Sequence, residues 1–194
     1  MISTKDSDDF QTTKSIRNTF GFVNHITSMS TTGYEADENK MLTGSSDGKI
    51  RIADLNSNAK IVNTIDNQGC SIRHMKMQDS TGYLLVADMS NTVKLWDLRS
   101  CSLISSYKDK GGHKTCIDTY KSDSFITSSE DGLLSIWDYR VNADPLAFTT
   151  VVDRLSNEKT PCKINKILHT RDVIYAACDS GMNIIRGFDD ISVS

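Results

Sequence analysis

The sequence predicts an all-β protein built from repeated antiparallel sheets, and three observations lead to this fold class. First, four segments share one pattern, in which an apolar strand, a tight turn and an alternating strand follow one another. Second, this pattern recurs roughly every 40 residues, as a stacked repeat does. Third, almost no segment has the apolar spacing of an amphipathic helix. The two prolines, Pro145 and Pro161, lie near predicted loops, where they disturb a sheet least.

Each repeated segment ends in a strand with two unlike faces. The four segments are residues 41–55, 83–98, 125–139 and 173–187. Ala53, Trp96 and Trp137 occupy equivalent places in the first three, 43 and 41 residues apart. The alternation of apolar and polar residues before these places is typical of strands with one face toward a core.

Residues that permit tight hairpins stand between the two strands of each segment. The four dipeptides are Asp47-Gly48, Ser90-Asn91, Asp131-Gly132 and Ser180-Gly181. Asp-Gly suits two-residue turns that need positive φ, and the other two pairs are permitted substitutes. The segments are therefore predicted to be β-hairpins.

Two further strand candidates accompany each hairpin. The predicted outer strands are 60–65, 102–107 and 145–152, and the predicted inner strands are 22–29, 71–77, 115–120 and 163–168. A period of about 40–45 residues, a terminal Trp-Asp pair and four strands per unit describe a β-propeller blade. The sequence therefore predicts about four blades of four antiparallel strands.

From about residue 20 onward, the chain resembles the WD-repeat family. The most specific stretch is 111–138, which has the family's Gly-His pair, its Asp-Gly turn and its closing Trp-Asp. The resemblance implies a buried, hydrogen-bonded tetrad in this blade. Its members would be His113, Thr127 (or Ser129), Asp131 and Trp137.

The other blades depart from the family pattern. The first has Phe22 for His and Ala53 for Trp, the second has Cys70 for His and Ser90 for Asp, and the fourth places Arg186 at the Trp position. We therefore expect a complete tetrad in the third blade alone.

The resemblance also implies a ring of seven blades, which needs roughly 300 residues. The predicted plan is a disordered tail at 1–12, a leading outer strand at 13–20, and blades near 21–66, 69–108, 112–152 and 161–194. We expect a true N-terminus and an early C-terminus, and hence an incomplete ring. Three alternatives follow, in this order of preference: the chain is part of a longer protein, a partner or second copy completes it, or it closes as a small four-bladed ring.

Composition and motifs give no support to catalysis or to a cofactor. The net charge of −3 argues against nucleic-acid binding through bulk charge. The five cysteines are widely spaced, so neither a disulfide framework nor a zinc site is expected, and reduced thiols suggest an intracellular protein. His25, His74 and His169 fall on or beside predicted inner strands, but no spacing among them favours a metal. No secretory signal or apolar run of membrane-spanning length is present.

Two W-D-x-R motifs mark a candidate partner-binding site. Arg99 and Arg140 follow the Trp-Asp pairs of consecutive blades and are expected on one rim. In the WD-repeat family this motif resembles a feature of substrate receptors of cullin-type ubiquitin ligases. The alternative is that each arginine pairs with the aspartate at its own strand end.

The predicted function is that of a protein–protein interaction scaffold, a non-enzymatic subunit of an intracellular assembly in the cytoplasm, the nucleus or both. Rigid blades that display many loops suit this role. The expected partners are other proteins, including the remaining propeller blades from a longer chain or another subunit. Membranes and small-molecule substrates are not expected, and nucleic acid is disfavoured. A ligase substrate receptor and a nucleic-acid- or histone-associated factor are the alternatives.

Overall fold

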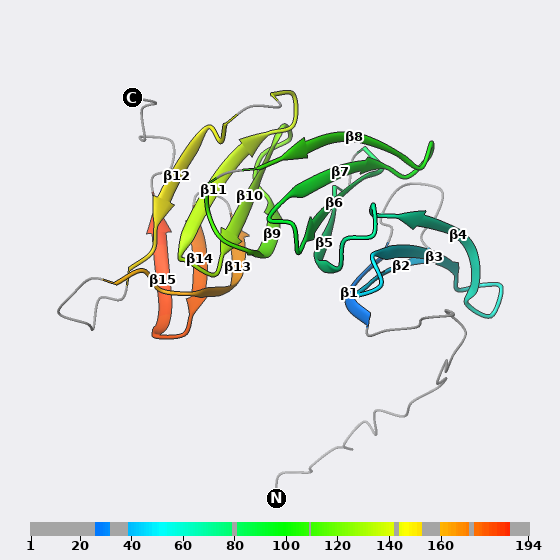
Figure 1. Ribbon diagram of the computed structural model, residues 1–194, viewed down its shortest axis with the longest axis horizontal. Helices are drawn as coiled ribbons and strands as arrows, with labels where there is room; N and C mark the ends of the chain where they lie inside the picture. Colours follow the sequence, from blue (N-terminus) through cyan, green and yellow to red (C-terminus); the bar gives the residue numbers. More distant parts are fainter. Residues whose placement is uncertain are drawn as a thin grey trace, which may run out of the picture.

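The described residues of the computed structural model form four antiparallel sheets that follow one another along an open arc (Figure 1). These residues are 26–31, 39–78, 81–108, 110–141, 144–152, 160–170 and 173–186. Within them every regular element is a strand, and no helix long and apolar enough to cross a membrane occurs. The predicted tail at 1–12 and leading strand at 13–20 lie outside the described residues.

Each sheet is a meander in which strands pair in chain order. The first contains β1 (Ile26–Thr31), β2 (Lys40–Ser45), β3 (Lys49–Asp54) and β4 (Lys60–Asp66). The second contains β5 (Ile72–Gln78), β6 (Tyr83–Asp88), β7 (Val93–Asp97) and β8 (Ser102–Tyr107). The third contains β9 (Lys114–Thr119), β10 (Ser124–Ser129), β11 (Leu133–Asp138) and β12 (Ala147–Thr150). The fourth contains β13 (Ile164–Thr170), β14 (Val173–Cys178) and β15 (Gly181–Arg186).

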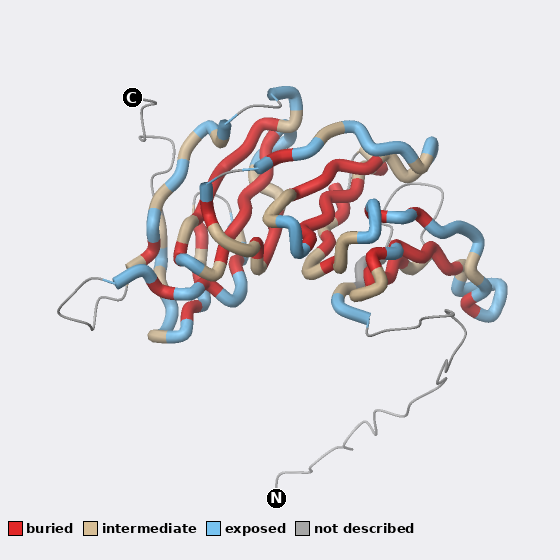
Figure 2. The backbone as a smooth tube through the Cα atoms, viewed as in Figure 1, coloured by how far each residue is buried: buried red, intermediate tan, exposed pale blue. Residues whose placement is uncertain are grey.

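In the first three sheets the middle strands are mostly buried and the outer strands mostly exposed, as Figure 2 shows, whereas buried and less buried residues alternate along β14 of the fourth. Strands β6 and β10 are buried along nearly their whole length, whereas β4 and β8 are mostly exposed. In the second and third sheets, a neighbouring sheet covers each face of the middle strands. The run of apolar residues in such a strand reflects burial on both faces.

Three clusters of the core form layers that each lie between two consecutive sheets. Between the first and second sheets, Leu42 and Ile50 pack with Met75, Leu84 and Trp96. The layer between the second and third sheets contains Leu85, Val93, Leu95, Tyr107, Phe125 and Trp137. The layer between the third and fourth contains Ile126, Leu134, Ile136, Ile164, Ile167 and Ile174. In the second and third sheets, the face that carries Trp96 or Trp137 is thus turned toward the preceding sheet.

The hairpin turns differ in length from the prediction. In the first and third sheets, three residues separate the strands, and Gly48 and Gly132 hold φ values of 77° and 79°. The amide of Gly48 donates to the carbonyl of Ser45, which is the arrangement of a type I turn closed by a left-handed residue. A two-residue turn is found in the fourth sheet, between Cys178 and Gly181.

The inner strands β1, β5, β9 and β13 lie on the concave side of the arc (Figure 1). They contact one another in that order, while the first and fourth sheets stand at opposite ends. The predicted all-β fold of four successive blades is confirmed, with three strands described in the fourth. The described residues form an incomplete ring, as expected.

Candidate protein-interaction site

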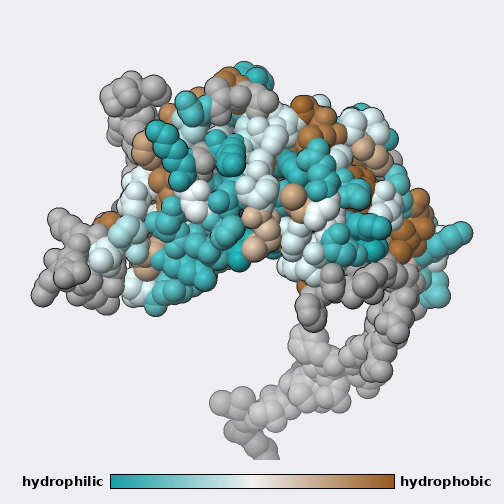
Figure 3. All heavy atoms as spheres, in the orientation of Figure 1, coloured by the Kyte–Doolittle hydropathy of each residue, from teal (hydrophilic) through white to brown (hydrophobic). Residues whose placement is uncertain are grey.

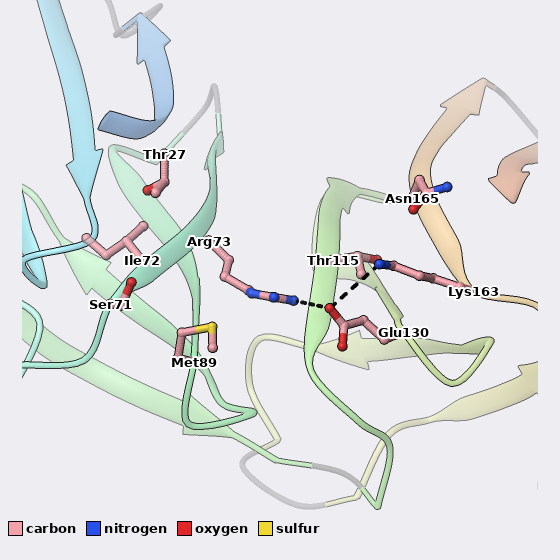
Figure 4. Close-up of a pocket in the computed structure, with 9 residues that line it drawn as sticks. All are labelled: Thr27, Ser71, Ile72, Arg73, Met89, Thr115, Glu130, Lys163 and Asn165. Carbon is pink, nitrogen blue, oxygen red and sulfur yellow. Dashed lines mark hydrogen bonds and ion pairs between the residues drawn. The ribbon is translucent and has the colours of Figure 1, made fainter. Parts of the chain in front are cut away.

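A polar pocket lies at the end of the arc's inner edge where the inner strands begin. We use "inner edge" for the surface formed by β1, β5, β9, β13 and the turns that adjoin them. The pocket has a volume of about 370 Å³ and takes lining residues from all four sheets (Figure 4). Thr27 comes from the first sheet, Arg73 from the second, Glu130 from the third and Lys163 from the fourth.

Two cations share one carboxylate across this pocket. Nη1 of Arg73 lies 2.6 Å from Oε1 of Glu130, and Nζ of Lys163 lies 4.0 Å from the same oxygen (Figure 4). All three side chains are about one third to one half exposed. The hydrogen bond from Arg73 holds the pKa of Glu130 below its usual value. The group therefore keeps a local net positive charge.

Further along the inner edge, a neutral histidine lies beside a lysine. Nδ1 of His74 accepts a hydrogen bond of 3.2 Å from the amide of Ile117, and Nζ of Lys166 lies 2.9 Å from its Nε2. Burial, together with the positive charges of Lys166 and Lys76, lowers the pKa of His74 to about 4, and Asp118 acts in the opposite direction. The imidazole is therefore uncharged at neutral pH.

The neighbouring thiol is not prepared for nucleophilic chemistry. Cys116 is buried, and its Sγ lies 3.8 Å from Nε2 of His74. Burial raises the pKa of this thiol, although Lys166 acts in the opposite direction. The thiol stays protonated at neutral pH, and a protonated thiol is a poor nucleophile. Within the described part of the chain, no group of three or more His, Cys, Asp or Glu residues is placed to hold a metal ion.

A second ion pair extends the polar inner edge. Nζ of Lys76 lies 2.9 Å from Oδ1 of Asp118, and Oδ2 of Asp118 accepts a 2.9 Å hydrogen bond from the amide of His169. These contacts join β5, β9 and β13. In Figure 3 the surface near the middle of the arc is largely hydrophilic, and hydrophobic residues gather toward the periphery of that view.

The structure brings together some members of the tetrad implied for the third blade. Nε1 of Trp137 donates a 2.9 Å hydrogen bond to Oγ1 of Thr127, and both residues are buried. Asp131 accepts hydrogen bonds from the Ser129 hydroxyl and, at 2.8 Å, from the amide of Gly112. Nδ1 of His113 is buried and has no hydrogen-bond partner among the described residues. A continuous four-residue link therefore stays a prediction.

A polar network of different composition ties the second blade. Nε1 of Trp96 donates to Oδ1 of Asn67 at 3.3 Å, and Nδ2 of Asn67 donates to Oδ2 of Asp88 at 3.1 Å. Nζ of Lys94 lies 3.0 Å from the same Asp88 oxygen. Sequence reasoning missed this network because it followed only the family's residue types. The sequence feature that could have indicated this network is Lys94, which stands two residues before Trp96. It therefore lies on the same buried face of the strand as Trp96, where a cation needs a polar partner.

The fourth blade differs from the prediction by one residue. In the third sheet Phe125 pairs with Trp137, and in the fourth Ile174 pairs with Ile185. Ile174 and Ile185 both pack against the third sheet, just as Trp96 and Trp137 pack against the sheet that precedes their own. Ile185, and not Arg186, therefore occupies the Trp position. The shorter turn of the fourth hairpin causes the shift.

The two arginines of the W-D-x-R motifs are exposed at strand ends. Nε and Nη2 of Arg140 lie 2.9 and 2.6 Å from the Asp138 carboxylate, and Nη1 lies 3.6 Å from Asp123. This is the pairing that the alternative interpretation expects. At Arg99, the backbone amide donates to Asp97 at 2.9 Å. Binding of a ligase adaptor by Arg99 and Arg140 stays a prediction.

Successive antiparallel sheets packed face to face, with a buried Trp near the end of the third strand in the second and third sheets, define a protein of propeller blades. The family model described as "WD domain, G-beta repeat" matches residues 14–54 and 101–138. These two segments thus match the WD repeat, and the predicted resemblance to the WD-repeat β-propeller family is confirmed.

Relatives of the chain include two curated proteins. It is 28% identical over 123 residues to Nucleoporin Nup43 of Mus musculus, and 28% identical over 122 residues to Nucleoporin Nup43 of Homo sapiens. Each match covers 60% of this chain and 32% of the relative. The matched region thus spans about one third of the relatives' length.

Two solved structures share the fold. The computationally designed Ika4 protein matches with a TM-score of 0.65 and 15% identity, over 86% of this chain and 93% of that chain. The designed Ika8 protein matches with a TM-score of 0.65 and 14% identity, over 84% of this chain and 46% of that chain. These likenesses support the fold alone.

Proposed function

We propose that this chain is a protein-interaction scaffold, a non-enzymatic subunit of an assembly at the nuclear pore. The observation that carries the proposal is an apolar face left exposed on the fourth sheet. The similarity of the chain to proteins named nucleoporins supports a location at the nuclear pore. This location agrees with the predicted compartments, which are the nucleus, the cytoplasm or both.

The exposed face contains large apolar side chains from all three strands of the fourth sheet. We call it the end face and define it by Leu168, Tyr175, Met182 and Ile184. Leu168 pairs with Tyr175 and Tyr175 with Ile184, so these three form one row on one side of the sheet. Met182, 67% exposed, stands on the same side two residues before Ile184. The opposite side, with Ile167 and Ile174, is buried against the third sheet.

The position of the end face indicates what covers it. In the first, second and third sheets, the corresponding side is buried against the next sheet along the arc. An uncovered apolar sheet face is a site for association. We propose that another propeller blade covers it, from the remainder of a longer chain or from another subunit. Proteins are then the partners through which the chain enters its assembly.

Imaging of a fluorescent fusion in cells of the source organism tests this proposal. The wild-type chain should concentrate at the nuclear rim. The variant Met182→Lys/Ile184→Lys should become diffuse, because charges on the end face prevent an apolar partner from covering it. Ile104→Lys is a matched control, since Ile104 is 47% and Ile184 45% exposed and Ile104 lies on outer strand β8. A diffuse wild-type fusion, or rim localisation of the double variant, would contradict the proposal.

A further inference from the structure

Two groups of charged side chains on the inner edge each hold two cations and one carboxylate. Arg73, Lys76 and Lys163 and the nearby Lys166 bring four positive charges, while Glu130 and Asp118 bring two negative ones. The full chain has a net charge of −3. Asp179 accepts a 2.6 Å hydrogen bond from Asn165 of the pocket lining, so the excess of positive charge is local to these two groups. Such local segregation favours a partner of the opposite sign.

We propose that the inner edge binds an acidic segment of a partner protein and seats one of its carboxylates in the pocket between Arg73 and Lys163. The proposal rests on the scaffold function in that the partner is a protein. It goes beyond that function because it assigns a second surface, separate from the end face, and the chemistry that this surface recognises.

The geometry of the pocket suits a single carboxylate. The guanidinium of Arg73 has five N–H donors, and its contact with Glu130 joins Nη1 to Oε1. The ammonium of Lys163 is 4.0 Å from that oxygen, beyond a normal hydrogen-bond distance. Both cations therefore have donors available for an incoming anion. The pocket volume of about 370 Å³ has room for one or two side chains.

The lining of the pocket favours a peptide over a nucleic-acid strand. Met89, which is 43% exposed, supplies apolar surface on one side of it, and this suits the aliphatic part of a glutamate (Figure 4). Among its lining residues in the described chain there is no aromatic side chain on which a base could stack.

Glu130 has a specific place in this proposal as an internal competitor. It occupies the position on Arg73 that the partner's carboxylate would share. Its neutral isostere should release Arg73 and Lys163 for the ligand and increase affinity. A purely structural ion pair predicts no such gain. Glu130→Gln therefore separates a binding role of the pocket from a stabilising role.

Fluorescence anisotropy with the purified full chain tests the proposal. The probes are a labelled peptide of four Glu-Ala repeats, the matching Gln-Ala peptide and an oligothymidylate of eight nucleotides. We expect the Glu-Ala peptide to bind at least about tenfold more tightly than either other probe at low salt, since hydrogen bonds to charged groups are the strong ones. Arg73→Gln and Lys163→Gln should each weaken its binding about tenfold, and Glu130→Gln should strengthen it.

The control variant is Lys60→Gln, which removes an exposed lysine from outer strand β4 and should leave binding unchanged. Thermal melting of each variant tests whether the fold is intact. Arg73→Lys is a further variant that keeps the positive charge at this position. Equal binding of the Glu-Ala and Gln-Ala peptides would overturn the proposal, as would loss of affinity in Glu130→Gln. Tighter binding of the oligonucleotide would identify a nucleic-acid surface instead. Peptide binding at the inner edge and localisation through the end face are measured with different variants. The proposed binding site and the proposed scaffold function can therefore be contradicted separately.

Discussion

At the residue scale, one position on the closing strand decides how each blade satisfies its buried polar groups. This position, two residues before the Trp position, holds Arg51, Lys94 and Ser135 in the first three blades. All three residues are buried. Arg51 pairs with Asp47 at 2.9 Å, and Lys94 pairs with Asp88. A buried cation requires such a counter-ion because burial without one is costly.

The Lys94–Asp88 pair yields a stability prediction. Burial would raise the pKa of Asp88, but hydrogen bonds from Ser90 and Lys94 outweigh it and lower the pKa. Lys94→Met leaves this carboxylate without its cation and should destabilise the chain by about 3 kcal/mol. Asp88→Asn/Lys94→Met should cost less than the sum of the two single substitutions. Urea denaturation of the three variants measures this, and strictly additive costs would show that the pair is not coupled.

The lowered pKa of His74 makes stability depend on pH in one direction. The pKa is about 4 in the folded chain and about 6.5 when exposed, so the unfolded state takes up the proton first as pH falls. Stability that is present above pH 6.5 is therefore lost between pH 6.5 and 4. From pH 7.5 to pH 5, the wild type should lose about 2 kcal/mol more than His74→Gln. Denaturation curves at both pH values test this, and parallel losses would refute it.

At the scale of elements, hairpin turns fix the spacing of adjacent sheets. A Cβ on Gly48 would lie 2.8 Å from the carbonyl carbon of Gly69, in the loop that leads to the second sheet. A Cβ on Gly132 would lie equally close to the carbonyl oxygens of Val151 and Cys162. The turn glycines therefore permit close approach as well as positive φ. The sequence predicted the positive φ of these glycines but contained no local pattern that indicates the close approach of the backbones.

Gly48 and Gly69 form a matched pair for testing this close approach. Both have positive φ, but a Cβ on Gly69 would meet nothing within 4 Å. Gly69→Ala should cost about 1 kcal/mol through backbone strain alone. Gly48→Ala should cost at least about 1 kcal/mol more, because backbone atoms must also move. Equal shifts in the urea midpoint would mean that the turn tolerates the extra atom.

The accuracy of the sequence-based prediction follows the physical origin of each feature. Hairpins and alternating strands are encoded locally, so strands such as 83–88 and 133–138 lie where the repeat pattern put them. The Asn67 side chain, in contrast, reaches Trp96 from a loop, and no local pattern encodes that contact. The pocket around Arg73 and Glu130 depends on a contact between two sheets, and the two residues that make it are 57 positions apart in sequence. Such contacts follow only from the assembled arc.

At the scale of the whole molecule, the arc ends in an apolar surface that its own described sheets leave uncovered. Burial of an apolar side chain such as Ile184 is worth about 1.5–3 kcal/mol, so the end face should drive association of the isolated chain. We expect the average mass in sedimentation velocity to rise with concentration. Met182→Lys/Ile184→Lys should suppress this rise and Ile104→Lys should not. A compact monomer at every concentration would instead favour closure as a small four-bladed ring, because closure would cover the end face within one molecule.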